Sequence, residues 1–253
     1  MSANLPQWID ALMQGLSWTR PDSKFFGQAI LWSAVTLGFY FLTRYMHSRI
    51  PRWWIAPLVA APVLLLITLI ATDTSYTVYI SGTHWLIVLL GPAIVAFAVP
   101  IYEQRKLIGQ NWQVLIIGVL VGSAVAILTS WGLATLLGID GILRISLLPR
   151  SISTPFAMNV SAVIGGIPEL TAVFVVITGI FGASVGEFIL LWLPTRSVLA
   201  RGALFGMSAH VAGSHKAYQL NPDYGAIAGL VMVFAGILNV VAAPLLAMLL
   251  QRL

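Results

Sequence analysis

The sequence predicts an all-α membrane protein, a bundle of about seven or eight transmembrane segments in which some helices are broken at proline. Of its 253 residues, 59% are apolar and only 8% are charged, whereas soluble domains carry about 25% charged residues. Thirteen Lys/Arg and eight Asp/Glu cannot cover the surface of a soluble protein of this size. The apolar residues also fall into runs about as long as a bilayer is thick.

The first 24 residues differ from the apolar runs that follow. Apolar side chains recur there at helical spacing: Leu5, Trp8, Ile9, Leu12, Met13 and Leu16. This spacing predicts an amphipathic helix that either lies in the membrane interface or packs on a partner. The stretch lacks the basic start and compact apolar core of a signal peptide. We therefore divide the chain into an N-terminal extension, residues 1–24, and one membrane domain, residues 25–253.

Eight apolar runs follow this extension. Four of them have the length of a spanning helix and no acid or base at their centres: 25–46, 54–71, 114–137 and 226–250. The other four are interrupted by proline or charge, so each is expected to cross, to break midway or to re-enter: 85–101, 142–164, 170–193 and 197–211. Basic residues follow the first run and the run 85–101, and the positive-inside rule places both of these loops in the cytoplasm.

A polar cluster lies inside the run 142–164. Its cation is Arg150, and a charge within a membrane segment indicates a function by default. On a continuous helix one face carries Arg150, Thr154, Ala157 and Ser161. A guanidinium can bind a carboxylate bidentately while hydroxyls donate to it. The cluster therefore predicts a carboxylate site, with a histidine from a later run: Arg150, Ser151, Ser153, Thr154, Asn159 and His210. The alternative is that Arg150 snorkels to the interface and the hydroxyls bond to helix backbone.

Two prolines are predicted to break helices and to expose backbone groups near this site. They are Pro92 and Pro155, which lack the N–H that the preceding turn of a helix requires. The sequences at 89–92 and 147–149 share two leucines and a proline ahead of a long apolar helix. Paired interrupted segments of this kind suggest an internal repeat around a transport site.

Two residues are candidates for proton coupling. His210 titrates near neutral pH, and Glu169 begins a new helix after Pro168, where it is either a stabiliser of the helix start or a proton carrier. His215 and Lys216 are expected to end a helix in the headgroups. His210 and His215 are five residues apart without an acidic neighbour, so no metal site is predicted. Nucleotide-binding loops, catalytic constellations and cysteines are missing from the sequence, so neither an enzyme nor a cofactor is expected.

A face of small residues follows in the next run, where another helix can approach closely. It consists of Gly202, Gly206, Ala209 and Gly213, at spacings of three or four residues. We expect the three glycines, Gly202, Gly206 and Gly213, to serve helix packing, either within the chain or between copies of it.

Three blocks of the sequence carry a family resemblance. They are LGPAIVAFAVPIY at 90–102, LPRS, TPFAM and GGIP within 148–168, and ARG, AH and Gly213 within 200–213. These blocks resemble the LrgB/CidB family of bacterial membrane proteins, which includes a plastid glycolate/glycerate translocator. The likeness extends from about Trp54 to the C-terminus, so residues 1–24 look like an addition to the family core. The family usually has Lys where Arg150 stands, and its usual Gly-Thr-Ala-Arg is Gly-Ser-His-Lys at 213–216.

The resemblance implies two kinds of function. Some members carry small carboxylates such as glycolate, glycerate or pyruvate, and others are holin/antiholin-like regulators of murein hydrolases and autolysis. We predict a multi-pass transporter of such monocarboxylates in the bacterial inner membrane, with the holin-like role as the alternative. Its expected partners are the bilayer, the acid, and further copies of the chain or a small LrgA/CidA-type membrane protein. Nucleic acid is not expected, because the basic residues are scattered singly.

Overall fold

The computed structural model describes residues 23–50, 52–96, 98–192 and 197–250. Within these ranges the chain is helical and contains no strand, which confirms the predicted all-α class. The chain divides into two compact units, Met1–Leu89 (unit 1) and Leu90–Leu253 (unit 2), a division that the sequence did not suggest. The predicted amphipathic helix falls in residues 1–22, outside the described residues.

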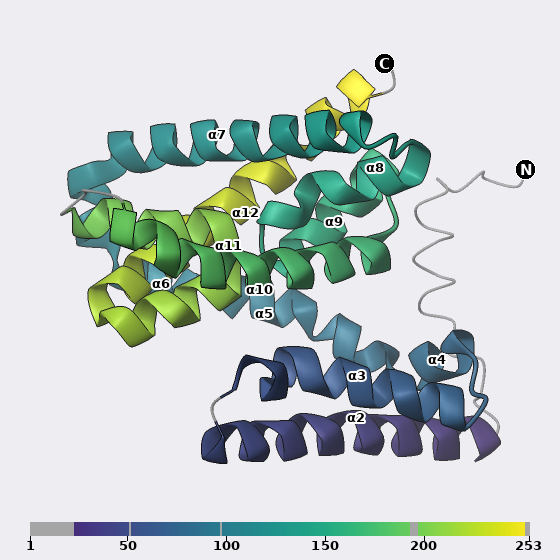
Figure 1. Cartoon of the computed structure of the whole chain (residues 1–253). Helices are drawn as coiled ribbons and strands as arrows, with labels where there is room; N and C mark the ends of the chain where they lie inside the picture. Colours follow the sequence, from purple (N-terminus) through teal and green to yellow (C-terminus); the bar gives the residue numbers. More distant parts are fainter. Residues whose placement is uncertain (1–22, 51, 97, 193–196, 251–253) are drawn as a thin grey trace, which may run out of the picture. The chain divides into compact units, whose positions relative to one another are not determined.

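The described part of unit 1, residues 23–50 and 52–89, contains three helices and one short 3-10 turn. They are α2 (Ser23–Arg49), η1 (Trp53–Ile55), α3 (Pro57–Ala71) and α4 (Tyr76–Val88) (Figure 1). The helix α2 packs against both α3 and α4. Its closest approach to α4 is at Gly82, where a Cβ would lie 3.0 Å from the Ala29 Cα. Helix α3 has 15 residues and extends over about 22 Å, less than the roughly 30 Å hydrocarbon core of a bilayer.

Unit 2 contains the three described helices that are long and apolar enough to cross a membrane: α7 (Arg105–Leu136), α10 (Pro168–Trp192) and α12 (Pro222–Leu250). They correspond to the predicted runs 114–137, 170–193 and 226–250. The elements between and before them are α5 (Leu90–Ala96), α6 (Ala98–Glu103), α8 (Gly141–Leu147), η2 (Leu148–Ser151), α9 (Thr154–Ile164) and α11 (Val198–Leu220). The number of crossings in the whole chain stays a prediction.

The run 142–164 folds back on itself, and we call α8, η2 and α9 together hairpin A. Ser146 in α8 and Ser161 in α9 lie side by side, because the Thr171 hydroxyl is 2.8 Å from the Ser146 carbonyl oxygen and 2.7 Å from the Ser161 hydroxyl. On a straight helix these two serines would be about 22 Å apart. The chain turns at Ile152 and Ser153, whose ψ angles of 167° and 149° are extended.

Helix α11 also reverses its direction, at His210, and we call it hairpin B. His210 has φ 40° and ψ −122°, which are not helical values. A Cβ on Gly213 would overlap with the carbonyl oxygen of Phe205, although these residues would be about 12 Å apart on a straight helix. The arm after His210 therefore returns alongside the arm before it. Both runs, 142–164 and 197–211, therefore turn back on themselves, whereas the sequence allowed a crossing, a break midway or a re-entry.

The two hairpins enter unit 2 from opposite ends. Hairpin A begins beside the end of α7, where Arg144 donates to Thr135 (3.3 Å), and hairpin B begins beside the end of α10, where a Cβ on Gly186 would lie 2.9 Å from the Phe205 ring. Figure 1 shows α8 and α9 near one end of α7 and α11 toward the other. The tips of both hairpins therefore come to the middle of the long helices.

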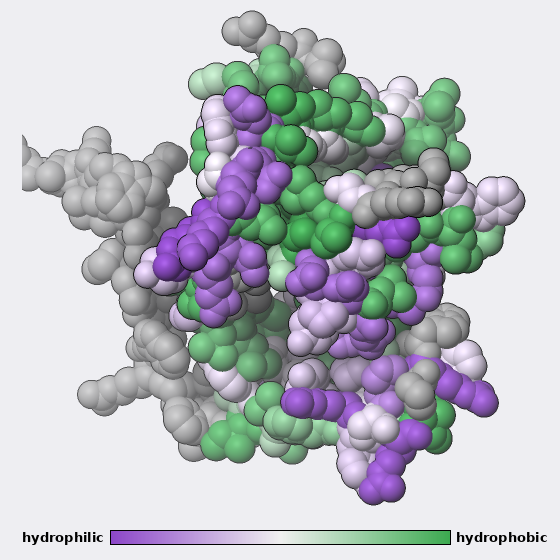
Figure 2. All heavy atoms as spheres, turned by 90° about the vertical axis from the view of Figure 1, so that its left-hand side faces the viewer, coloured by the Kyte–Doolittle hydropathy of each residue, from purple (hydrophilic) through white to green (hydrophobic). Residues whose placement is uncertain are grey.

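The described surface suits a bilayer. Large apolar side chains are exposed on all three long helices, among them Leu136 (83%), Leu191 (79%) and Val241 (74%). An apolar surface of this extent marks a site of interaction with lipid or protein. Figure 2 shows one side of the chain, where hydrophilic side chains gather between hydrophobic ones.

The Thr171 hydroxyl joins both arms of hairpin A to α10, so its removal should loosen the hairpin. Thr171→Val leaves the buried Ser146 carbonyl and Ser161 hydroxyl without this partner, and we expect a loss of roughly 1–2 kcal/mol. In a protein of this size this lowers the apparent Tm by about 2–8 °C, as measured by thermal unfolding in detergent. The matched control is Thr129→Val, because Thr129 is exposed and bonds only to its own helix; equal effects of both variants would contradict the prediction.

Candidate functional site

The candidate site is centred on Arg150, at the tip of hairpin A. Its Nε donates to the Ser130 hydroxyl of α7 (3.0 Å) and its Nη1 to the Thr178 hydroxyl of α10 (3.5 Å). The side chain is partly buried, and within the described residues it takes part in no ion pair. Arg150 therefore points into the bundle, toward the last third of α7 and the middle of α10, and carries a charge that no carboxylate of the described chain balances.

The tip of hairpin A adds hydroxyls around this guanidinium. Ser153 is completely buried, and its hydroxyl has no hydrogen-bond partner in the part of the chain that the structure describes. It precedes α9 as the capping residue, and its side chain makes no capping hydrogen bond to the helix. Ser151 is buried as well, and Thr154 is partly buried as the first residue of α9. Two predicted ligands, Ser151 and Ser153, thus flank the turn beside Arg150.

The expected continuous helical face is wrong. Arg150 belongs to η2, whereas Thr154, Ala157 and Ser161 belong to α9 beyond two extended residues. Pro155 is the second residue of α9, where a missing N–H removes no helical bond. The turn itself lies at Ile152 and Ser153, so Pro155 starts a helix rather than breaking one.

His210 forms the tip of hairpin B. Its side chain is 4% exposed, and its Nε2 has no hydrogen-bond partner among the described residues. The ring lies on Gly179 of α10, because a Cβ there would be only 2.6 Å from the His210 Cε1. Gly179 follows directly on Thr178, the residue that accepts from Arg150. Both hairpin tips therefore meet the same turn of α10.

A small cavity lies where the hairpins meet the long helices. Its lining includes Ser123 of α7, Ser151 of hairpin A, Met207 of hairpin B and Asn239 of α12. The volume is about 10 Å³, roughly the minimum that holds one water. This cavity is therefore too small for an acid of two or three carbons.

Four polar residues of this region were not predicted from the sequence. They are Ser123, Ser130, Thr178 and Asn239, each inside a long apolar helix. Asn239 donates to the Ser123 hydroxyl (3.0 Å) and thereby links α12 to α7. The sequence signal that could have identified Asn239 is an amide within the apolar run 226–250, because a polar side chain at membrane depth needs a partner.

A second, larger cavity opens at the end of unit 2 where α7, α11 and α12 begin. It has a volume of about 370 Å³ and polar lining residues that include Gln104, Asn111 and Asp223. It is large enough for a small organic acid. Because it lies at the starts of these helices, it is separated from the Arg150 site by about half of their length.

Comparison with known proteins identifies the family of the chain. The model of the LrgB-like family matches residues 36–249. The chain belongs to the LrgB-like family. The match begins before Trp54, where the sequence resemblance was expected to start, and it includes parts of both units. No solved structure gives a significant match.

Several curated relatives of this LrgB-like chain match nearly over their whole length. The uncharacterized protein YwbG of Bacillus subtilis is 37% identical over 84% of this chain and 94% of its own length. The uncharacterized protein YxaC of the same organism is 33% identical, over 87% of this chain and 96% of its own length. The holin-like protein CidB of Staphylococcus epidermidis is 27% identical, over 88% of this chain and 97% of its own length.

The structure places three predicted site residues of the LrgB-like chain away from the Arg150 site. Asn159 is exposed and donates to the Pro155 carbonyl of its own helix (2.9 Å). Glu169 is exposed in the first turn of α10, the position expected of a stabiliser of the helix start. Pro92 is the third residue of α5, after α4 ends with Leu89 as its cap.

The three predicted packing glycines of the LrgB-like chain contact helices of the chain itself. A Cβ on Gly202 would lie 2.6 Å from the Ile227 Cβ of α12, and a Cβ on Gly206 would overlap with the Ala228 carbonyl of α12. Gly213 meets Phe205 in the other arm of hairpin B. They do not form one face, because the helix reverses between Gly206 and Gly213. The glycines are therefore occupied within the chain.

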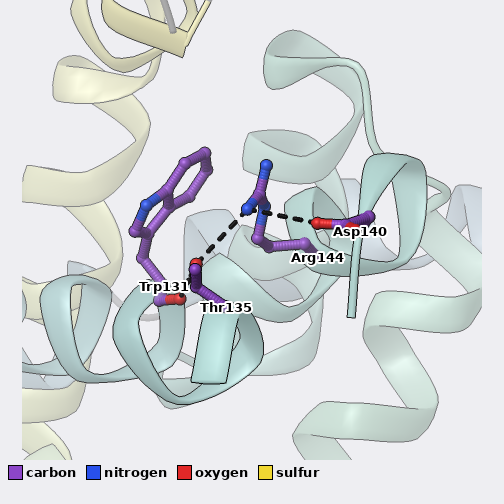
Figure 3. Close-up of polar contacts among 4 residues, drawn as sticks. All are labelled: Trp131, Thr135, Asp140 and Arg144. Carbon is purple, nitrogen blue, oxygen red and sulfur yellow. Dashed lines mark hydrogen bonds and ion pairs between the residues drawn. The ribbon is translucent and has the colours of Figure 1, made fainter. Parts of the chain in front are cut away.

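Charged contacts fix each hairpin near its base. Figure 3 shows Arg144 of hairpin A among Trp131, Thr135 and Asp140: its Cζ is 4.1 Å from the Trp131 ring centre, and its Nη1 is 3.5 Å from the Asp140 carboxylate. In hairpin B the Lys216 Nζ is 2.8 Å from the Glu187 carboxylate of α10. Lys216 lies inside the second arm and is paired, whereas the sequence predicted it at a helix end in the headgroups.

Proposed function

We propose that this membrane protein carries small monocarboxylates, of the pyruvate, glycolate or glycerate kind, across the bacterial inner membrane. The observation that carries the proposal is the position of Arg150: a guanidinium without an acidic partner in the described chain, at the tip of a re-entrant hairpin, among hydroxyls of two long helices. A charge inside a membrane domain is costly and is kept where it pairs with an ion in transit. A carboxylate is the anion that its planar fork fits bidentately.

The two hairpins support a carrier rather than a pore. Transporters commonly place the substrate near the middle of the bilayer, between discontinuous helices that enter from opposite sides. Here the turn of hairpin A at Ile152 and the turn of hairpin B at His210 have this arrangement. The cavity of about 10 Å³ between them is closed to an acid, so movement of one hairpin at a time would expose the site to one side.

Proton coupling is part of the proposal, and His210 is its better candidate. Glu169 is exposed at the start of α10, whereas His210 is buried against Gly179, next to the partner of Arg150. A proton that accompanies the acid would compensate its charge at the site.

The second candidate function is a holin-like role together with a small LrgA/CidA-type membrane partner. It is favoured by the name of the relative CidB, a holin-like protein. Assembly through the glycine face is the less suitable route, since Gly202, Gly206 and Gly213 pack within the chain. Partners would then contact other surfaces.

Counterflow in proteoliposomes separates these two functions. Vesicles with the purified full chain are loaded with unlabelled pyruvate or glycolate together with a trapped dye, and labelled acid is added outside. A carrier accumulates the label transiently above equilibrium, saturates with concentration and retains the dye. Leakage of the dye with no preference among acids would favour the holin-like role, and label uptake equal to that of protein-free vesicles would refute the transport proposal.

A further inference from the structure

His210 combines three features that its role in the fold does not explain. Its φ of 40° lies in a region that favours glycine. Its ring is 4% exposed, and its Nε2 is buried without a partner among the described residues. A glycine at the tip of hairpin B would permit the same turn without strain and without a buried unpaired nitrogen. The imidazole therefore costs stability twice, and such costs concentrate at functional sites.

On the side that faces α10, the His210 ring fills the space left open by a glycine. Gly179 supplies this space, because a Cβ there would be 2.6 Å from Cε1 and 3.3 Å from Nε2. Ala212 borders the same space from the second arm of hairpin B. Helix α10 thus contacts the imidazole through the backbone of Gly179 and Val175.

The position of His210 relative to Arg150 suggests a function for its unpaired Nε2. Nη1 of Arg150 is 3.5 Å from the Thr178 hydroxyl, and the His210 ring lies on the next residue of α10. Consecutive Cα atoms are about 3.8 Å apart. An acid whose carboxylate pairs with Arg150 would therefore lie near the same turn of α10 that the His210 ring contacts.

We propose that the His210 Nε2 hydrogen-bonds the oxygen on the second carbon of the acid, so that it selects 2-oxo and 2-hydroxy acids over unsubstituted acids. The inference rests on the proposed transport function and deepens it, because it assigns the selection between these acids to one atom, the His210 Nε2. A site that hydrogen-bonds such an oxygen rejects an analogue that lacks it, because its own polar atom then stays buried and unpaired.

The test uses pairs of acids of equal length and two isosteric variants. In proteoliposomes, lactate should compete with labelled pyruvate about 10- to 100-fold better than propionate does. His210→Asn removes the atom at the Nε2 position; lactate and propionate should then compete within about threefold, with propionate itself unchanged. His210→Gln restores an amide near the Nε2 position and should restore the preference.

The outcomes separate this inference from the transport proposal. If wild-type protein takes up no acid saturably, the transport proposal fails. If it transports and His210→Asn keeps the full lactate preference, the inference on His210 is wrong and the transport proposal stands.

A second measurement uses the unmodified chain, in case the variants do not fold. Carbethoxylation by diethyl pyrocarbonate is followed by mass spectrometry at the four histidines. Lactate should protect His210 at concentrations at which propionate does not, while His215, which is exposed, reacts equally with either acid. Equal protection of His210 by the two acids would overturn the inference.

Discussion

Replacement of Arg150 by alanine should abolish acid uptake. The guanidinium is the only cation of the described chain placed at the tip of hairpin A, and without it the carboxylate of the substrate would be desolvated and unpaired. Loss of one partner of a buried ion pair costs roughly 2–5 kcal/mol, which corresponds to about a 30- to several-thousand-fold decrease in kcat/KM for counterflow. The measurement is initial uptake of labelled pyruvate or glycolate over a concentration series.

Two further variants separate a binding role of Arg150 from a structural one. Arg150→Lys keeps the charge and loses the planar fork, so it should retain measurable uptake with a raised KM. Arg49→Ala removes an exposed cation of α2 in unit 1 and should transport like wild type. Wild-type uptake by Arg150→Ala would remove the site assignment, and an Arg150→Lys variant as inactive as Arg150→Ala would show that the charge alone does not suffice and that the site requires the planar fork.

Substitution of Gly206 by alanine should destabilise the protein strongly. A Cβ at this position would overlap with the Ala228 carbonyl oxygen and lie 2.9 Å from the Ala228 Cα. These atoms belong to the backbone of α12 and cannot rotate away, so hairpin B would have to move from α12. We expect Gly206→Ala to cost about 3 kcal/mol and to lower the apparent Tm by roughly 6–12 °C.

The matched control for Gly206→Ala is Gly118→Ala in α7. Gly118 has no heavy atom within 4 Å of its virtual Cβ, so the added methyl meets open space. Alanine favours a helix over glycine by about 0.5–1 kcal/mol, and this variant should be as stable as wild type or slightly more stable. Thermal unfolding in detergent and elution as a single species check both variants; a Gly206→Ala protein with the wild-type Tm would show that hairpin B does not pack on α12 in this way.

The composition and the apolar runs were enough to predict the class of fold. In lipid every backbone N–H and C=O must be bonded within the chain, so an apolar run of sufficient length becomes a helix whatever its neighbours are. For this reason α7 and α12 agree with the predicted runs 114–137 and 226–250. The run 170–193 was predicted as interrupted because of Glu187, yet α10 is continuous, since this carboxylate pairs with Lys216.

The candidate site was predictable only in part. Arg150 stood out because a charge inside an apolar run is unusual, and Ser151 and Ser153 adjoin it in sequence. Asn159 was included because it belongs to the same polar stretch of the sequence, whereas it is exposed on α9. Ser130 and Thr178 could not be identified, because they come from helices distant in sequence and meet Arg150 only through packing.

By itself the sequence determined that this chain is a helical membrane protein with a cation among hydroxyls, since burial in lipid constrains which residues can stand in an apolar run. Only the tertiary structure decided that the segments 142–164 and 197–211 turn back. A straight helix and a hairpin have the same apolar periodicity, and the choice between them depends on contacts of distant residues such as Thr171 with Ser146 or Gly206 with Ala228. Those contacts, rather than any local pattern, bring Arg150 and His210 to one turn of α10.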